Sequence, residues 1–487
     1  RLIYYSSSDQ DFPKKIGELK IGAFDFTQGR PPLDTEFESF PDHYFSLGQE
    51  DTYYENLNEI GDTYRAEALI ALRDIAANDS IYQEVKELEI TKISVTRGVK
   101  ESWILNQFRR MTKGAARLTE YDFLYNLPRA RGDQSSGRTL SFVVKPESLP
   151  PSNIHVLIGR NGVGKSRTLN KMAKSLIYPS RSAAQHGNFV TRTGSRMQAG
   201  NYLFSNLVSV SFSAFDDFDL SAEDSELTYK YIGLRRTSNR GAPVGTPKSP
   251  DMLANDFHEN FCACSAASAK TRRLKLVIER LSNDTLFAYT NPLCLFEMWE
   301  SHKPAVDTPE AWSIANEGHR LEVCKWFKKL SSGHQIILLT LTALVEHTEE
   351  KTLVLLDEPE GHLHPPLIAA FIRALSDLLT DRNGVAIVAT HSPVILQEVP
   401  KSCVWRMDRY GADVSLSRPT IETFGENTGI LTREIFGIIV DQAGFHSLLE
   451  QAVDNFVSFD EAMEDFNGSL GFEAQAILRN LFATKNQ

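Results

Sequence analysis

The sequence predicts an α/β fold with a parallel sheet and added helical regions. A short apolar segment at 154–158 leads into a glycine-rich turn, and a helical pattern follows to about residue 176. The same alternation returns after residue 330, where helix, strand, helix and strand are expected at 333–347, 352–356, 366–379 and 385–389. Apolar strands that alternate with amphipathic helices are typical of parallel strands covered on both faces.

The chain has 487 residues, which is more than one ordinary hydrophobic core contains. We expect three parts: an N-terminal extension with the first strands of the core at 1–150, an α/β core at 151–427, and a helical region at 428–487. The core is expected to contain an insertion at about 180–325, without the sustained heptads of a long coiled coil. Within the extension, three- and four-residue apolar spacing predicts one amphipathic helix from Tyr53 to Asp79.

Composition narrows the possible environments and partners. A net charge of −11 argues against a chain that coats nucleic acid over its whole surface. The five cysteines are scattered, which suits a reducing compartment. No segment approaches the roughly 20 apolar residues of a membrane span, and no leader pattern is present. We therefore expect a cytoplasmic chain without a membrane partner.

One group of possible metal ligands lies in the predicted insertion. Cys262, Cys264 and His258 are close in sequence. A structural zinc site normally has a second ligand pair at a similar spacing, and none follows here. We therefore interpret these three as ordinary residues.

A phosphate-binding motif follows the first apolar strand. The run from Gly159 to Ser166 matches G-x-x-x-x-G-K-[ST], with the preceding strand and following helix that the motif requires. Its glycines let backbone N–H groups converge on phosphate at a helix N-terminus. Lys165 is expected to bridge the β- and γ-phosphates, and Ser166 to bind Mg²⁺. The predicted ATP-binding residues are Arg160, Asn161, Gly162, Val163, Gly164, Lys165 and Ser166.

Polar side chains follow the two later strands. The strand at 352–356 runs into Asp357, a predicted Mg²⁺ ligand, and Glu358, the predicted general base for the attacking water. The strand at 385–389 is followed by His391, which we expect to sense the γ-phosphate. The carboxyl ends of neighbouring parallel strands meet at one edge of a sheet, so these groups are expected to lie together.

A second anion-binding helix start is predicted between these motifs. Ser331 and Gly333 precede a long apolar helix. The serine is a good N-cap, and the free N–H groups of a helix N-terminus favour anions. An ordinary helix cap explains this run equally well when it is considered alone. Its position between the phosphate loop and Asp357 favours a second contact with ATP.

The order of these motifs resembles the ABC-type ATPases that include RecF, the coiled-coil break-repair ATPases and the overcoming-lysogenization-defect (OLD) family. The run from Asp357 to Pro365 is most similar to the OLD-like branch. The resemblance implies ATP hydrolysis in a head-to-tail dimer. In such a dimer the signature of one chain, here the run Leu330–Gly333, completes the ATP site of the other. It also implies that His362 and His364 are loop residues rather than metal ligands.

Two positions depart from this pattern. His334 lies where the group usually has Gln or Glu, and the run Ser213–Asp216 occupies the place of the Q-loop glutamine after the apolar segment 208–212. The second departure puts magnesium sensing by that loop in doubt.

Other segments resemble the PtuA ATPases of Septu-type and retron-linked antiphage systems. They are 42–49, 53–57, 68–76 and 231–236, and the segment 427–437 is similar to OLD-like chains more widely. This resemblance implies a separate HNH-type nuclease partner. In a retron-linked system it also implies a reverse transcriptase with its DNA/RNA product. Apolar residues at helical spacing after Leu431 suggest packing on the core or, as a second interpretation, docking of the nuclease.

Three other classes of protein share some of these features. A DNA-repair ATPase of the RecF or coiled-coil break-repair type is the main alternative, opposed by the unusual N-terminal part and the missing coiled coil. An OLD nuclease would need a Toprim domain after His391, for which no acidic pattern is visible. The long spacing between Lys165 and Ser331 and the missing Q-loop glutamine argue against a transporter subunit.

Overall fold

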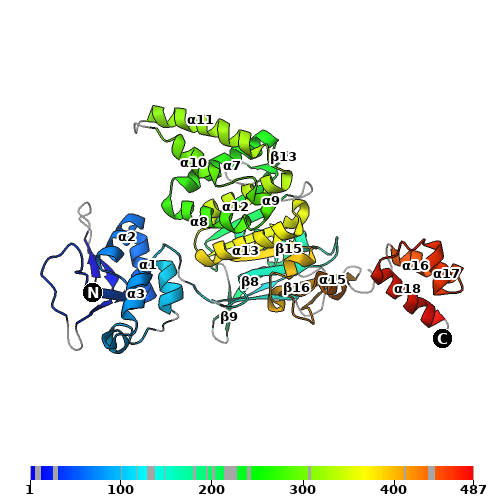
Figure 1. Ribbon diagram of the computed structural model, residues 1–487, viewed down its shortest axis with the longest axis horizontal. Coiled ribbons are helices and arrows are strands. Elements are labelled where there is room, and N and C mark those ends of the chain that lie inside the picture. The colour runs from blue at the N-terminus through cyan, green and yellow to red at the C-terminus, as the bar shows by residue number, and fades with distance from the viewer. Residues whose placement is uncertain are drawn as a thin grey trace.

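The computed structural model in Figure 1 describes most of the chain and groups it into three assemblies of elements. The described residues are 2–5, 13–25, 31–99, 101, 103–116, 118–128, 138–146, 148–178, 183–193, 196–199, 203–212, 227–237, 243–304, 309–410, 413–436 and 445–485. The first assembly is an N-terminal module, the second contains the central sheet, and the third is a small group of C-terminal helices.

A seven-stranded sheet forms the centre, in the order β11-β10-β14-β15-β7-β16-β17. Its strands are β7 (Ile154–Ile158), β10 (Asn206–Ser211), β11 (Thr228–Gly233), β14 (Thr352–Asp357), β15 (Val385–Thr390), β16 (Val404–Tyr410) and β17 (Asp413–Ser417). Every neighbouring pair is parallel except β16 with β17. The predicted α/β fold class is therefore confirmed.

The register brings three strand ends to one edge of this sheet. Asp357 of β14 lies opposite Ala389 of β15. Thr390, the last residue of β15, lies opposite Ile158 at the end of β7. Because the strands are parallel, the phosphate loop, the acidic pair Asp357–Glu358 and the run Thr390–Ser392 all begin at this edge.

Alternating residues of the buried strands face two separate cores. Val354 and Leu356 pack into one core, whereas Leu353 and Leu355 pack into the other. The first core lies between one face of the sheet and four helices: α7 (Pro250–Ser265), α8 (Ser268–Leu281), α12 (Ser332–His347) and α13 (Pro365–Asp381). This two-sided burial explains why the strands read as continuous apolar runs.

The opposite face is covered by one helix and a second sheet. Helix α5 (Lys165–Ile177) packs there beside a four-stranded antiparallel sheet. Its strands, in the order β6-β5-β8-β9, are β5 (Tyr121–Asn126), β6 (Thr139–Val144), β8 (Asn188–Thr193) and β9 (Arg196–Ala199). In Figure 1 the helices α8, α12 and α13 lie on one side of the central sheet, and β8 and β9 lie on the other.

The N-terminal module has its own aromatic-rich core. It contains β1 (Leu2–Tyr4), β2 (Lys14–Gly17), β3 (Leu19–Ala23), β4 (Tyr44–Gly48), α1 (Asp51–Ile60), α2 (Asp62–Ala71), α3 (Asp79–Val85), α4 (Arg109–Met111) and two short π-helices, Thr91–Val95 and Trp103–Phe108. The prediction of one helix from Tyr53 to Asp79 was wrong. Gly61 has a φ of 128°, which a helix cannot continue through, so α1 ends there and α2 begins after it.

Helices also make up most of the predicted insertion. After a short hairpin of β12 (Arg235–Thr237) and β13 (Pro243–Pro247), α7 and α8 are followed by α9 (Thr285–Ala288), α10 (Cys294–Ser301) and α11 (Pro309–Phe327). Helices α11 and α12 both pack against α7. The segment between β11 and α12 is therefore part of the main core rather than a separate arm.

The C-terminal part divides at a different place from the expected boundary at residue 428. Helix α15 (Thr428–Phe436) buries Leu431 and Ile435 in the main core. Helices α16 (Phe445–Asn455), α17 (Phe459–Asp465) and α18 (Phe472–Lys485) instead form a core of their own, at the end of the molecule beyond α15 in Figure 1. No helix among the described residues is long and apolar enough to cross a membrane.

Candidate functional site

The phosphate loop lies between β7 and α5 and has the backbone that its glycines allow. Gly162 and Gly164 have φ values of 81° and 102°, which side-chain-bearing residues rarely adopt. A Cβ on either would meet no atom within 4 Å, so there is open space over the loop. A Cβ on Gly159 would instead lie 2.2 Å from the carbonyl oxygen of Met407. Gly159 therefore fixes the loop against β16.

Lys165 is folded back over this loop. Its Nζ donates to the carbonyl oxygens of Gly159, at 3.0 Å, and Arg160, at 3.2 Å. It also lies 3.8 Å from Oε1 of Glu358. Burial lowers the pKa of Lys165, and the neighbouring carboxylates Glu358 and Asp357 oppose that effect. The ammonium group is thus held by carbonyl oxygens that an incoming phosphate can replace.

Ser166 and Asp357 meet directly at the strand edge. Oγ of Ser166 donates to Oδ1 of Asp357 at 2.9 Å. Burial raises the pKa of Asp357 to about 6, although the Ser166 hydrogen bond acts in the opposite direction. A hydroxyl and a carboxylate in contact offer two oxygen ligands, which is the ligand type that Mg²⁺ prefers. These two residues fit the Mg²⁺ role predicted for them.

Glu358 and His391 lie together beside this pair. Glu358 has a φ of 46° and ψ of 56°, a left-handed conformation, and it precedes the 3₁₀ turn η3 (Pro359–His362). Its Oε1 lies 3.6 Å from Nδ1 of His391. Both side chains are partly exposed, at 40% for Glu358 and 47% for His391. They are therefore open to a molecule that approaches the strand edge.

A third carboxylate holds this arrangement in place. Oε1 of Glu360 accepts hydrogen bonds from Oγ1 of Thr390 and from the backbone N–H of His391, the latter at 2.8 Å. The same oxygen lies 3.3 Å from Nδ1 of His391. Only 6% of the Glu360 side chain is exposed. Sequence reasoning did not select Glu360, although its place as the third acid of Asp-Glu-Pro-Glu was a visible signal.

The predicted signature forms a helix N-terminus at the surface. Ser331 caps α12, and its side chain accepts from the N–H of His334 at 3.4 Å. Ser331 and Ser332 are exposed, whereas Gly333 is buried. In the described residues neither serine has a hydrogen bond with the phosphate loop. The signature therefore offers free N–H groups at the start of a long helix without contacting ATP-binding residues of its own chain.

The signature contacts the loop that follows Glu358. A Cβ on Gly333 would lie 2.4 Å from the carbonyl oxygen of His362. His364 extends this contact region, because its Nε2 lies 2.8 Å from Oδ2 of Asp284, the residue that caps α9. His334 contacts the ring of Phe287 on the same helix. His362 thus lies in the loop that Gly333 contacts, and His364 links this loop to α9.

The structure brings most of the predicted site residues to one edge, with two qualifications. The guanidinium of Arg160 donates to the carbonyl oxygen of Phe436, so its predicted ATP contact depends on its backbone N–H. Val163 is buried in the core beneath the loop, while Asn161 is exposed.

Arg409, which the sequence did not indicate, donates to the carbonyl oxygen of Gly162. The run Ser213–Asp216, where the Q-loop glutamine is missing, lies outside the described residues.

These residues fit ATP with Mg²⁺. The open loop and the N-terminus of α5 suit the phosphates, Lys165 supplies the cation, and Ser166 with Asp357 supplies metal ligands. Oε2 of Glu360 is buried without a hydrogen-bond partner, so the site contains acceptor capacity that the described protein atoms do not use. Bound Mg²⁺ would neutralise charge that develops on the transferred phosphoryl group.

The parallel sheet, the phosphate loop and the acidic pair define the chain as a P-loop ATPase domain. Residues 325–397 match the family model described as "AAA domain, putative AbiEii toxin, Type IV TA system". The chain is also 37% identical over 482 residues to protein ea59 of Escherichia phage lambda, covering 97% of this chain and 90% of that protein. The chain belongs to the family of protein ea59.

Solved structures of transporter components are also similar in part. The ATP-binding cassette MJ1267 of an ABC transporter, in its ADP conformation, matches 66% of this chain and 96% of its own at 12% identity and a TM-score of 0.28. A bacterial Atm1-family ABC exporter with ATP bound matches 66% of this chain and 44% of its own at 9% identity and a TM-score of 0.27. The fold class follows from the topology of the central sheet and from the motifs at its edge.

Proposed function

We propose that the chain is an ATP-dependent dimerising switch in a defence complex, in which ATP bound by one chain is closed over by the signature of a second. The observation that carries this proposal is the exposure of Ser331 and Ser332 at a helix N-terminus that makes no hydrogen bond with its own phosphate loop. An exposed helix start with free N–H groups is a ready phosphate contact for another copy.

Contacts within one chain suggest how such closure would reach the chemistry. A phosphate of the ATP bound by the second chain would contact Ser331 at the start of α12. Gly333, two residues on, packs on His362, and η3 connects that residue to Glu358. Closure would therefore also fix the position of Glu358, the general base, in the chain that supplies the signature. Glu358 would then remove a proton from the attacking water, while Glu360 holds His391 beside it.

Dimerisation is tested by a substitution in the signature with a matched control. Ser331→Arg places bulk and charge in the expected dimer seam. Ser458→Arg is the control, because Ser458 is also exposed and also caps a helix, accepting from the N–H of Glu461. Each variant loses one capping bond. Light scattering with ATP should show wild type and Ser458→Arg as dimers and Ser331→Arg as a monomer that still binds ATP. ATP-driven dimers of Ser331→Arg would overturn the proposal.

The finer part of the proposal is the partner. We infer a separate HNH-type nuclease, as in PtuA-like systems, and in a retron-linked system a reverse transcriptase with its DNA/RNA product. Support comes from the segments that resemble PtuA and from the matching family model, whose description names a toxin of a toxin–antitoxin system. Both point to a chain that works with a second component.

Co-purification tests this partner. The chain should be expressed from its natural locus with every neighbouring reading frame, and then purified with and without ATP. Stable capture of an HNH nuclease, at levels that change in Glu358→Gln, is expected. Stimulation of ATP hydrolysis by DNA ends without any captured nuclease would favour the DNA-repair class instead.

A further inference from the structure

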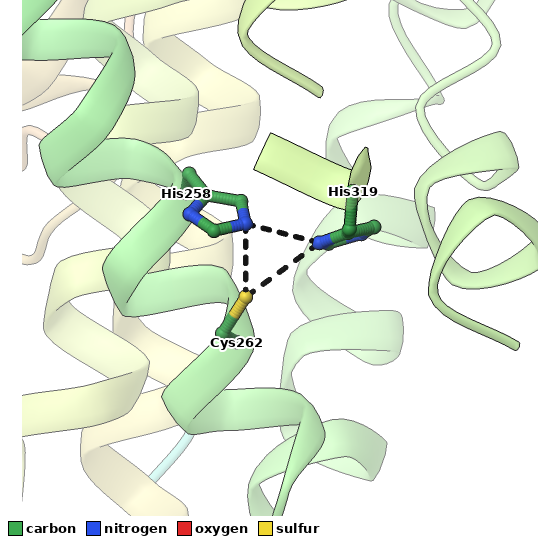
Figure 2. Close-up of side chains that lie close together, drawn as sticks. All are labelled: His258, Cys262 and His319. Atoms are coloured by element: carbon green, nitrogen blue, oxygen red, sulfur yellow. Dashed lines mark hydrogen bonds between the residues drawn. The ribbon is translucent and has the colours of Figure 1, made fainter. Parts of the chain in front are cut away.

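Three possible metal ligands from two separate helices converge in the helical region (Figure 2). His258 and Cys262 lie one turn apart on α7, and His319 reaches them from α11. Nε2 of His258 lies 3.0 Å from Nδ1 of His319 and 3.3 Å from Sγ of Cys262. Sγ of Cys262 lies 3.6 Å from the same Nδ1. The three atoms thus form a closed triangle.

Hydrogen bonds cannot use all three contacts of this triangle at once. A nitrogen of a neutral imidazole either carries a proton and donates, or carries a lone pair and accepts. Each of the two nitrogens faces both the other nitrogen and the sulfur. Whatever the tautomers, at least one of the three contacts is left without a well-aligned hydrogen bond. A cation at the centre of the triangle would use a lone pair from all three atoms at once.

The size of the triangle suits zinc. Zinc binds nitrogen at about 2.0–2.1 Å and thiolate sulfur at about 2.3 Å, usually in tetrahedral geometry. Those bond lengths separate two nitrogens by about 3.3 Å and a nitrogen from a sulfur by about 3.6 Å. The observed separations of 3.0, 3.3 and 3.6 Å need only shifts of a few tenths of an ångström.

The surroundings keep the two imidazoles neutral. His258 and His319 are buried, and burial lowers the pKa of both, to about 4 for His319. The His319 ring packs against aromatic side chains, with ring centroids 5.3 Å from Trp299 and 5.9 Å from Phe261. Neutral imidazole is the form that binds metals. His302 lies nearby, with its Nδ1 2.9 Å from the carbonyl oxygen of Met298 and its Nε2 3.7 Å from Oε2 of Glu322.

We propose that His258, Cys262 and His319 bind a zinc ion that ties α11 to α7, with a fourth position open to water. Cys262 is only half-buried, so this position can be reached from one side. On binding, the thiol proton passes to solvent and the thiolate becomes the third ligand. The site is independent of ATP, because none of its residues belongs to the phosphate loop, the acidic pair or the signature.

Metal content and cobalt spectroscopy of the full chain test the site. Chain purified from zinc-supplemented cells should contain near-stoichiometric zinc by mass spectrometry. After chelation, Co²⁺ should produce the near-ultraviolet band of a thiolate bound to cobalt. Cys262→Ser should lose that band and most of the zinc. Cys294→Ser, which changes another half-buried cysteine outside the triangle, should keep both.

Two results would overturn the proposal. One is a wild-type chain, folded by circular dichroism, that contains no zinc and shows no cobalt–thiolate band, which would make the triangle a hydrogen-bonded cluster only. The other is full zinc content with an unchanged band in Cys262→Ser, which would assign the metal to different ligands. The first result uses the natural chain, and circular dichroism shows whether Cys262→Ser is folded in the second.

Discussion

Gly333 lies so close to His362 that a Cβ atom would sit 2.4 Å from the His362 carbonyl oxygen. Gly333→Ala should therefore displace the loop that follows Glu358 while leaving the phosphate loop unchanged. We expect ATP affinity to persist and turnover to fall roughly 10- to 100-fold, the scale expected when a catalytic group is misplaced by about 1 Å. Calorimetry and phosphate release measure the two quantities.

Gly361→Ala is the matched control, because a Cβ there meets no atom within 4 Å and the residue lies in the same loop. Equal losses in both variants would show that the loop is sensitive to any added methyl group, and would contradict the role of the Gly333 contact.

Lys165→Ala should weaken ATP binding by roughly tenfold or more, the scale of a lost charge-assisted contact. The Lys165 ammonium already lies over the loop on two carbonyl oxygens, so it is placed to meet an incoming phosphate. Calorimetric titration with ATP measures the change. Lys174→Ala, at the far end of α5, should bind normally. Unchanged affinity in Lys165→Ala would refute the phosphate-loop assignment.

Glu358→Gln should retain ATP binding and prolong the ATP-bound dimer. The amide keeps the shape of the side chain but loses the basicity needed to accept a proton from water. The backbone N–H of residue 358 still donates to the carbonyl oxygen of Ala389, so the turn is expected to hold. Single-turnover hydrolysis and size-exclusion chromatography with ATP follow both effects. Wild-type turnover would assign the general base elsewhere.

Mg²⁺-dependent ATP binding should weaken as the pH falls through about 6. Burial raises the pKa of Asp357 to about 6, so below that value the carboxyl is protonated and loses its negative charge as a metal ligand. Above it, Asp357 is ionised and the metal binds. Because this pKa is raised, ionisation of Asp357 without metal lowers stability, and the neutral form stabilises the fold at lower pH.

Calorimetric Mg²⁺ titrations between about pH 5 and pH 8 measure this dependence. Asp357→Asn should bind Mg²⁺ weakly at every pH and show little change across the range. A wild-type affinity that stays constant through about pH 6 would mean that Asp357 is not the titrating ligand.

Deletion of residues 437–487 should leave a folded chain that still binds ATP. Helices α16, α17 and α18 pack mainly on one another, with Leu449 and Leu478 in their shared core. The shorter deletion of 457–487 removes two of the three helices and leaves Leu449 and Val453 exposed on α16. It should therefore lower solubility more than the longer deletion. Thermal unfolding and ATP titration of both variants check this order.

The same pair of deletions tests the docking interpretation of the C-terminal helices. If they dock the nuclease, the chain without 437–487 should bind ATP and dimerise but fail to capture the partner. Full capture by that variant would return α16–α18 to a purely structural role. Loss of ATP binding would show that the main core needs these helices.

The local chemistry of the site could be predicted because each of its motifs consists of contiguous residues. The phosphate loop between β7 and α5, and the apolar strands ending at Asp357 and Thr390, each specify their own backbone. Parallel pairing then brings the strand ends to one edge. The sequence patterns therefore predicted the α/β class and a common position for Lys165, Ser166 and Glu358.

Contacts between distant segments could only be decided by the tertiary structure. Periodicity did not show that Gly61 breaks the first helix, or that α15 joins the main core. The same holds for Gly333 against His362, and for His319 beside His258 and Cys262. Sequence patterns report which face of an element is apolar. Which two elements place their side chains within a few ångströms of each other depends on how the whole core packs.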